Sequence, residues 1–549
     1  MERRLDRIPP YHRAVLKGHL ASCGVPYAEM DRPIIAVVNS HNDFVAGHVP
    51  LRRLGDEVKE AIRAAGGLPL EFQTIAMCDG LAQGHAGMRY SLPSRDLIAD
   101  SVETMVRGHD IFDGVVLLAS CDKIVPAMLM AAARLDLPAV VVTGGPSGNA
   151  ITPAESKAAR QQFLKGDLSE EELVMVTAQY YNGPGICSFL GTANTMCMVT
   201  EALGLGLPGI ALAPADSEER LELVRESGRR IMELVLAGGP TPRQILTREA
   251  FEDAIALVLA IGGSLNTVLH LPAIAHEVGI ELTLDDWERV SRRTPFLTAV
   301  TPNHNGRTVN DLRRAGGTAA VLKELLPVLH GNRLTITGRT LAENVASAAL
   351  VADREIIRPF DQPLLASGGI QVLRGNLARE GALIKRSAVE SSYFRGPARV
   401  FEAEEAAEEA ATHGAIHPGD LVVVRYEGPK GGPGMRELHR LTEIIKKIGD
   451  VAVITDGRFS GASSGMAIGY LGPEAADGGN IALVHEGDFI TIDLAAGTVT
   501  LEVPDEVLAE RRNAWVATEK DASLLLRQYA RSVGPAAGGA VRLDWGCGV

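Results

Sequence analysis

Three cysteines, Cys78, Cys121 and Cys187, have sequence neighbours that make them candidate metal ligands. Cys78 and Cys121 each follow an apolar run and directly precede an aspartate, Asp79 and Asp122, whereas Cys187 ends a glycine- and proline-rich turn. Thiolates are soft ligands that suit iron–sulfur clusters and zinc, and carboxylates suit Mg²⁺. Because the cysteines are tens of residues apart, their spacing specifies no metal, and buried free cysteine is the alternative.

Three further polar residues are candidates for the same chemistry. Lys123 follows Asp122 directly. An ammonium group has only donors, so it forms an ion pair unless carbamylation turns it into an oxygen ligand. Glu427 lies in a loop rich in glycine and proline that lacks the spacing of a phosphate-binding loop. Ser460 follows a predicted strand. A metal nearby would lower the pKa of its hydroxyl enough for the serine to act as a base, although a flexible turn is the simpler interpretation.

An alternation of strands and helices must position the cysteines and aspartates. Uninterrupted apolar runs predict buried strands at 34–39, 70–76, 114–120 and 139–143, with helices at 51–65, 95–108 and 126–135 between them. This order predicts an α/β fold with a parallel sheet in a three-layer αβα arrangement. Parallel strands end at one edge of their sheet, so Cys78–Asp79 and Cys121–Lys123 are expected to lie together there.

The composition of the chain changes around residues 355–375, where prolines and glycines replace long helical periodicity. Short strands are predicted at 421–425, 451–455, 481–484, 489–494 and 498–503, with a helix at 435–448. This pattern favours a smaller C-terminal β-barrel-like domain. We therefore expect an α/β domain over 1–360 and a β-rich domain over 361–549 that contributes Glu427 and Ser460.

Charge and hydropathy exclude several classes of function. The 549 residues carry a formal net charge of −14, which argues against nucleic-acid binding. We find no secretion signal and no apolar run long enough for a bilayer, so we expect a cytoplasmic protein that acts on a small molecule away from membranes. Six cysteines in so long a chain do not form a disulfide framework.

Seven motifs together resemble those of one known family. They are Met77–Gly80, Tyr90–Arg95, Cys121–Pro126, Gly191–Met196, Leu373–Leu377, Tyr426–Met435 and Asp456–Gly461. Over nearly its whole length the chain resembles the dihydroxy-acid and sugar-acid dehydratases, a family that includes 6-phosphogluconate dehydratase. The resemblance implies a hydro-lyase that converts a 2,3-dihydroxy acid into a 2-keto acid, assembled as a homodimer or homotetramer.

The resemblance also implies a role for each candidate residue. Cys78, Cys121 and Cys187 would hold an iron–sulfur cluster, and Asp79, Asp122, carbamylated Lys123 and Glu427 would hold Mg²⁺. Ser460 would be the base that removes the C2 proton. An iron without a protein ligand would act as a Lewis acid on the C3 hydroxyl, while magnesium would stabilise the charge that develops on the substrate.

Departures from the family pattern bear on cluster type and substrate. Some relatives carry a cluster cysteine in the loop after the first strand, where this chain has residues 45–50 without one. The lack of a cysteine in this loop resembles the enzymes with [4Fe-4S] clusters more than those with [2Fe-2S] clusters. We expect the branched-chain substrate of valine and isoleucine synthesis. The alternative is an aldonate such as gluconate or xylonate, because residues 187–191 resemble the sugar-acid enzymes.

Two functions of other classes are alternatives to the dehydratase. An iron–sulfur electron carrier or redox sensor would have no use for acidic residues beside the cysteines. A zinc-stabilised scaffold would contain zinc without iron or sulfide. Metal analysis and dehydration assays separate these three.

Overall fold

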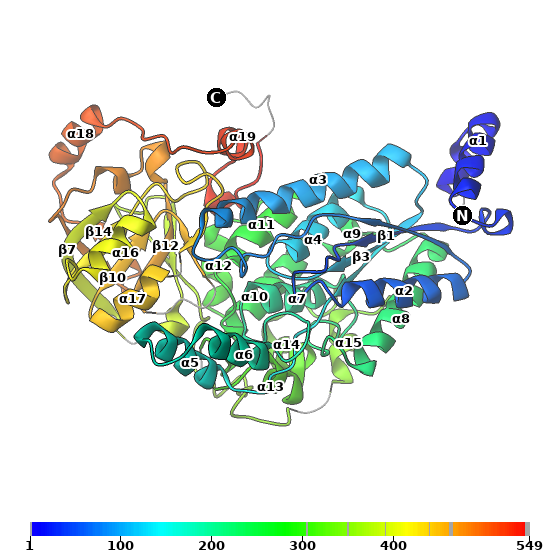
Figure 1. Cartoon of the computed structure of the whole chain (residues 1–549), viewed down its shortest axis with the longest axis horizontal. Helices are drawn as coiled ribbons and strands as arrows, with labels where there is room; N and C mark the ends of the chain where they lie inside the picture. The colour runs from blue at the N-terminus through cyan, green and yellow to red at the C-terminus, as the bar shows by residue number, and fades with distance from the viewer. Residues whose placement is uncertain are drawn as a thin grey trace.

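The structure is a computed structural model, and it describes residues 3–303, 306–348, 351–389, 391–438, 440–460 and 465–543. Gly461, which ends the last of the seven motifs, lies outside these ranges. Figure 1 shows an elongated molecule with the N-terminal helices and strands on one side and the C-terminal strands on the other.

The N-terminal part is built on a four-stranded sheet in the order β2-β1-β3-β4, and all its pairs are parallel. The strands are β1 (Ile34–Asn39), β2 (Leu68–Gln73), β3 (Gly114–Ala119) and β4 (Ala139–Thr143). Every residue of β1, β3 and β4 is buried. The continuous apolar runs of the sequence reflect this burial on both faces.

Helices cover both faces of this sheet. On one face α2 (Leu51–Ala64) packs beside α8 (Glu218–Ala237), and on the other α3 (Ser91–His109) packs beside α4 (Ile124–Leu135). Farther from the sheet, α11 (Thr267–Glu277) lies against α4, and α10 (Arg248–Ile261) lies against α7 (Thr192–Leu203). The predicted three-layer αβα arrangement is confirmed.

The C-terminal part contains an eight-stranded sheet in the order β14-β13-β7-β8-β10-β12-β6-β5. Its strands are β5 (Gln371–Leu373), β6 (Gly381–Ile384), β7 (Tyr393–Phe401), β8 (Leu421–Val424), β10 (Ala452–Thr455), β12 (Ala467–Gly472), β13 (Phe489–Asp493) and β14 (Thr498–Leu501). A bridge between Arg374 and Thr498 joins the two outermost strands, so the sheet nearly closes on itself. The predicted barrel-like fold is confirmed.

Two predicted elements of the C-terminal part are wrong. Residues 481–484 do not form a strand, because a 3₁₀ turn covers Asn480–Leu483. The helix predicted over 435–448 is shorter: α17 spans Arg440–Ile448, and the residues before it form the short strand β9 (Glu437–Leu438). This strand pairs in parallel with β11 (Arg458–Phe459). Glu437 therefore lies in a strand and not in a helix.

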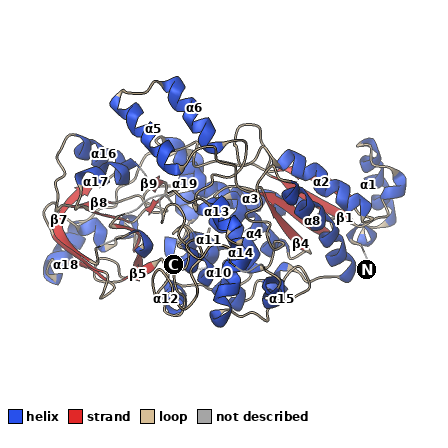
Figure 2. Ribbon diagram, turned by 90° about the horizontal axis from the view of Figure 1, so that it is seen from below, coloured by secondary structure: helices blue, strands red, loops and turns tan. Residues whose placement is uncertain are grey.

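The remaining helices are mostly peripheral. They are α1 (Pro10–Ser22), α5 (Pro153–Lys165), α6 (Glu170–Tyr181), α9 (Pro242–Ile245), α12 (Leu284–Ser291), α13 (Val309–Arg314), α14 (Gly317–Leu325), α15 (Leu341–Ala346), α16 (Glu404–Thr412), α18 (Asp505–Ala514) and α19 (Leu524–Ser532). Figure 2 shows α5 and α6 projecting as a pair from the body. None of the described helices combines the length and apolarity needed to cross a bilayer.

Each sheet has its own apolar core. One large cluster of buried side chains surrounds the four-stranded sheet and its helices. Two smaller clusters lie on the two faces of the eight-stranded sheet, one of them under α16 and α17. Leu383, Met435 and Tyr470 of the C-terminal part belong to the large N-terminal cluster, so the two parts pack directly against each other.

Candidate metal centre and catalytic site

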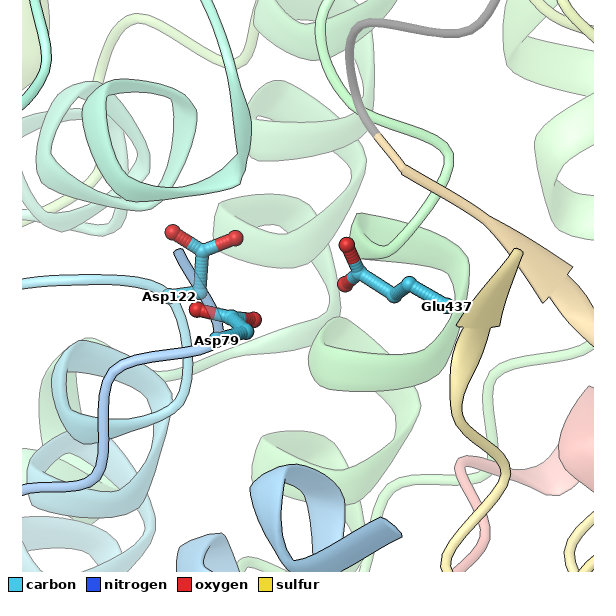
Figure 3. A group of neighbouring side chains, drawn as sticks. All are labelled: Asp79, Asp122 and Glu437. Carbon is cyan, nitrogen blue, oxygen red and sulfur yellow. The ribbon is translucent and has the colours of Figure 1, made fainter. Parts of the chain in front are cut away.

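Three carboxylates meet where the two parts of the chain pack together. Asp79 follows β2, Asp122 lies in the turn between β3 and α4, and Glu437 begins β9. Their ligand oxygens all lie within 4.8 Å of one another, and Figure 3 shows Glu437 facing the two aspartates from the opposite side. Three hard oxygen donors converging from three elements suit a divalent cation such as Mg²⁺.

The amine of Lys123 lies among these carboxylates and is fully buried. Its Nζ is 2.8 Å from Asp79 Oδ2, 3.1 Å from Glu437 Oε1 and 3.9 Å from Asp122 Oδ2. Burial disfavours the charged amine, but attraction by Asp79 and Glu437 outweighs it and raises the pKa of Lys123. Burial, with repulsion from Asp79, raises the pKa of Asp122. The site thus concentrates negative charge around one cation position.

Glu427 does not join this group. Its carboxylate receives hydrogen bonds from Arg436 Nε at 3.0 Å, Arg436 Nη2 at 2.8 Å and Lys520 Nζ at 2.9 Å. Arg436 also pairs with Glu405. Two cations already compensate the buried charge of Glu427, and the structure places Glu437 where the sequence led us to expect Glu427.

Glu437 is held by partners from both parts of the chain. Its Oε1 accepts hydrogen bonds from Asn266 Nδ2 at 2.7 Å and from Arg458 Nη1. Tyr470 donates its hydroxyl proton to Asn266 Oδ1 at 2.5 Å. Sequence reasoning missed Glu437 because it assigned residues 435–448 to one helix. The glycines and prolines just before it were the signal that an extended segment was possible.

The three predicted cysteines come together beside the carboxylates. The thiols of Cys78 and Cys121 are hydrogen-bonded to each other, which lowers the pKa of Cys78 and raises that of Cys121. Burial, with the nearby charge of Cys78, raises the pKa of Cys187 to about 12. Cys121 has a φ of 62°, a conformation that strains a residue other than glycine and is typical of functional turns.

Gly47 leaves room beside the thiols. A Cβ on Gly47 would lie 2.7 Å from Cys121 Sγ and 2.9 Å from Ser120 Oγ. Only glycine therefore lets the loop after β1 approach the sulfur this closely. Three sulfur donors in one place fit an iron–sulfur cluster better than they fit a hard cation.

Ser460 directly follows β11 and lies beside the strand that carries Glu437. Its backbone N–H donates to the carbonyl oxygen of Leu438 at 3.1 Å, and the residue is 8% exposed. The parallel pairing of Arg458 with Glu437 and of Phe459 with Leu438 fixes this position. A buried serine two residues beyond the partner of Glu437 suits proton transfer to or from a molecule bound beside the three carboxylates.

The fold and the neighbouring sulfur and carboxylate donors are those of a metal-dependent enzyme. Comparison with known proteins identifies the family. Residues 32–344 match the model of the dihydroxy-acid/6-phosphogluconate dehydratase N-terminal domain, and residues 355–540 match that of the C-terminal domain. The chain belongs to this family, as the sequence motifs predicted.

Three relatives that match the chain over nearly their whole length are dihydroxy-acid dehydratases. The chain is 47% identical to the dihydroxy-acid dehydratase of Caldanaerobacter subterraneus, over 100% of this chain and 99% of that protein. It is 47% identical to that of Moorella thermoacetica, over 98% and 99% of the two chains. It is 46% identical to that of Pyrococcus abyssi, over 98% of each.

Proposed function

We propose that the protein is a dihydroxy-acid dehydratase, a hydro-lyase that converts 2,3-dihydroxy-3-methylbutanoate and its homologue into 2-keto acids for valine and isoleucine synthesis. The observation that carries this proposal is the convergence of three thiols and three carboxylates at the contact between the two parts of the chain. Full-length relatives that bear this name support it.

The chemistry of the donor residues supports a proposal for the cofactors. Cys78, Cys121 and Cys187 would hold an iron–sulfur cluster of the [4Fe-4S] type, and Asp79, Asp122 and Glu437 would hold Mg²⁺. Carbamylation of Lys123 would replace a cation that competes with the metal by an oxygen ligand. When bound, the cluster supplies a Lewis acid for the C3 hydroxyl, and Mg²⁺ stabilises negative charge on the substrate carboxylate and C2 oxygen.

The side chains of the chain do the remaining work. Ser460 Oγ, as the alkoxide, would take the proton from substrate C2 and return it to the departing C3 hydroxyl, which leaves as water. The enol that remains tautomerises to the 2-keto acid. Asn266 and Arg458 hold Glu437 in place through hydrogen bonds to Oε1. Because these groups are buried, they act in a medium that strengthens electrostatic stabilisation.

We propose that the chain is organised as two domains. We assign residues 1–360 to the domain with the cluster and the two aspartates, and residues 361–549 to the domain with Glu437 and Ser460. We further propose a cytoplasmic homodimer or homotetramer, as the family resemblance implies.

Anaerobic purification followed by a substrate panel tests the function. We expect iron and sulfide in the protein, Mg²⁺-dependent keto-acid release from 2,3-dihydroxy-3-methylbutanoate, and less release from gluconate and xylonate. Activity confined to the sugar acids would favour an aldonate dehydratase instead. A cluster without any dehydration would favour an electron carrier or redox sensor, and zinc without iron or sulfide would favour a scaffold.

A further inference from the structure

Tyr470 on β12 has a strained backbone in a β-bulge. Its φ is 58°, in the left-handed region that a bulky residue rarely adopts. Between Gly469 and Gly472 the pairing of β12 with β6 shifts by one residue, so Tyr470 and Leu471 lie opposite a single residue of β6. Bulges beside active sites often re-aim a side chain, and backbone strain persists where the surrounding contacts hold it.

The bulge turns the side chain of Tyr470 toward the N-terminal part. Side chains alternate along a regular strand, so Tyr470 would share a face with Ile468, which packs in the core of the eight-stranded sheet. Leu471 packs in that core instead, and Tyr470 belongs to the large N-terminal cluster. The strained conformation therefore places one aromatic side chain at the contact between the two parts.

The hydroxyl of Tyr470 meets Asn266, the residue that directly precedes α11. It donates to Asn266 Oδ1 at 2.5 Å, and the same oxygen accepts a hydrogen bond from Arg458 Nη1 at 3.1 Å. Asn266 Nδ2 donates to Glu437 Oε1 at 2.7 Å and to Thr192 Oγ1 at 2.9 Å. All four hydrogen-bonding positions of this fully buried amide are thus occupied.

These partners favour one orientation of the amide. Arg458 and Tyr470 offer donors to Oδ1, whereas the ionised carboxylate of Glu437 only accepts. An amide turned by 180° would bring its oxygen against that carboxylate and its NH₂ against two donors. Burial raises the pKa of Tyr470, so the hydroxyl keeps its proton and remains a donor. Tyr470 therefore helps to keep the NH₂ of Asn266 directed at Glu437.

The backbone of Tyr470 is tied to the same site. Its N–H donates to the carbonyl oxygen of Gly457 at 2.8 Å, and Gly457 directly precedes β11. Arg458, the next residue, pairs with Glu437 both in the strand ladder and through its guanidinium. Backbone and side-chain contacts together fix the bulge relative to Glu437.

We propose that Tyr470 is a positioning residue for Glu437, the proposed Mg²⁺ ligand, and that it acts through the amide of Asn266. This inference rests on the proposed function, because it concerns the metal of that site. The hydroxyl takes no part in proton transfer. It limits the orientations of Asn266 and, through Asn266, those of the Glu437 carboxylate, as outer partners of metal ligands do.

Tyr470→Phe tests the proposal, because it removes the hydroxyl and keeps the ring. In the cluster-loaded protein we expect the Mg²⁺ concentration for half-maximal activity to rise about tenfold, the lower end of the usual loss, since Arg458 still holds Asn266. The rise in Tm that Mg²⁺ produces should need correspondingly more Mg²⁺. At saturating Mg²⁺, kcat and KM for 2,3-dihydroxy-3-methylbutanoate should stay close to the wild-type values. An unchanged Mg²⁺ dependence of activity and of Tm would overturn the proposal.

Tyr529→Phe is the matched control. Tyr529, on α19, also packs in the N-terminal cluster, and among the residues that the structure describes none is a hydrogen-bond partner of its buried hydroxyl. This substitution should leave the Mg²⁺ dependence as it is in the wild type. An equal rise in both variants would show that losing any buried hydroxyl at this contact has the same effect, and would refute the role of Tyr470.

A double-mutant cycle tests the route through Asn266. Asn266→Ala should itself weaken Mg²⁺ binding, because Glu437 loses a direct hydrogen bond. If Tyr470 acts through Asn266, adding Tyr470→Phe to this variant should weaken Mg²⁺ binding by less than about twofold more. A further loss as large as that in the single Tyr470→Phe variant would show that Tyr470 acts by another route.

Two readouts distinguish failure of this inference from failure of the proposed function. A wild-type protein whose Tm rises with Mg²⁺ but that dehydrates no dihydroxy acid would refute the function, and the Mg²⁺ titration of Tm in Tyr470→Phe would still decide the role of Tyr470. Dehydration with a wild-type Mg²⁺ dependence in Tyr470→Phe would refute only the role of Tyr470. A wild-type protein whose activity and Tm are both insensitive to Mg²⁺ would refute the inference.

Discussion

Glu427 and Glu437 are both fully or nearly buried, yet their surroundings give them different roles. Glu427 is neutralised by Arg436 and Lys520, which leaves it no free charge for a metal. Glu437 also pairs with two cations, Lys123 and Arg458, but it faces Asp79 and Asp122, so the local charge remains negative. The presence of neighbouring carboxylates, and not the number of cations, therefore distinguishes the candidate metal ligand from the structural ion pair.

Exchange of each glutamate for glutamine separates these roles. Glu437→Gln should lower Mg²⁺ affinity and kcat at least about 100-fold, because an amide binds Mg²⁺ poorly. Glu427→Gln should keep Mg²⁺ affinity but lower stability by about 3 kcal/mol, because Arg436 is left with a buried charge only partly compensated. Mg²⁺ titration of activity and thermal melts measure both. Loss of Mg²⁺ affinity in Glu427→Gln alone would reverse the assignment.

Glu201 gives the protein a pH-dependent stability unrelated to catalysis. The residue is buried in α7, and its Oε1 accepts a hydrogen bond from Ala211 N at 2.6 Å. Burial raises its pKa from 4.5 to about 7. Between these values the folded state holds a proton that the unfolded state has released, so stability falls as pH rises, by about 3 kcal/mol in full above pH 7.

Glu201→Gln should remove that cost, because glutamine keeps the acceptor and does not ionise. We expect the variant to be more stable than wild type by about 2–3 kcal/mol at pH 8 and nearly equal at pH 4.5. Urea unfolding at the two pH values measures this. Glu233→Gln, at an exposed site on α8, is the control and should show no such gain. A gain that is the same at both pH values would refute the titration of Glu201.

At the scale of elements, the loop from β8 to β9 must fit closely against the N-terminal part. Gly434 has a φ of 90°, and a Cβ there would lie 1.8 Å from the carbonyl oxygen of Arg89. Arg89 belongs to the segment that follows Asp79. The loop that leads to Glu437 is therefore in backbone contact with the 3₁₀ turn Ala86–Tyr90, which follows Asp79 along the chain.

Gly434→Ala should push the loop that leads to Glu437 away from this turn. The clash and the unfavourable φ together should cost about 2 kcal/mol or more in stability. Because Glu437 would move away from Asp79, the Mg²⁺ concentration needed for half-maximal activity should rise as well. Gly414→Ala tests strain alone, since Gly414 also has a positive φ but nothing within 4 Å of the Cβ position. Equal effects of both substitutions on Mg²⁺ would contradict the contact argument.

Long elements were predictable because their patterns are local. The runs at 34–39 and 114–120 match β1 and β3 almost residue for residue, since buried parallel strands are apolar throughout. β9 was not predictable, because two residues have no periodicity and their pairing partner β11 lies some twenty residues later. Glu427 and Lys520, which form an ion pair, are 93 residues apart in the sequence, so no local sequence pattern predicts this pair.

In the whole molecule, the three carboxylates of the candidate metal centre come from both parts of the chain. Asp79 and Asp122 come from the four-stranded sheet, and Glu437 comes from the strand pair beside the eight-stranded sheet. A cation bound by all three would have to be released when the parts separate. Cation binding should therefore stabilise the contact between them as well as support catalysis.

Magnesium should accordingly raise the Tm of the cluster-loaded protein. At a concentration one hundred times its Kd, a ligand of the folded state adds about 2.7 kcal/mol of stability. Removing Mg²⁺ with a chelator should lower Tm reversibly, and readdition should restore it. Glu437→Gln should abolish most of this shift because it removes the one ligand from the C-terminal part, whereas Glu427→Gln should melt at a lower temperature but keep the full shift. A Mg²⁺-dependent Tm that survives in Glu437→Gln would mean that the aspartates bind the ion alone and that the metal does not join the two parts.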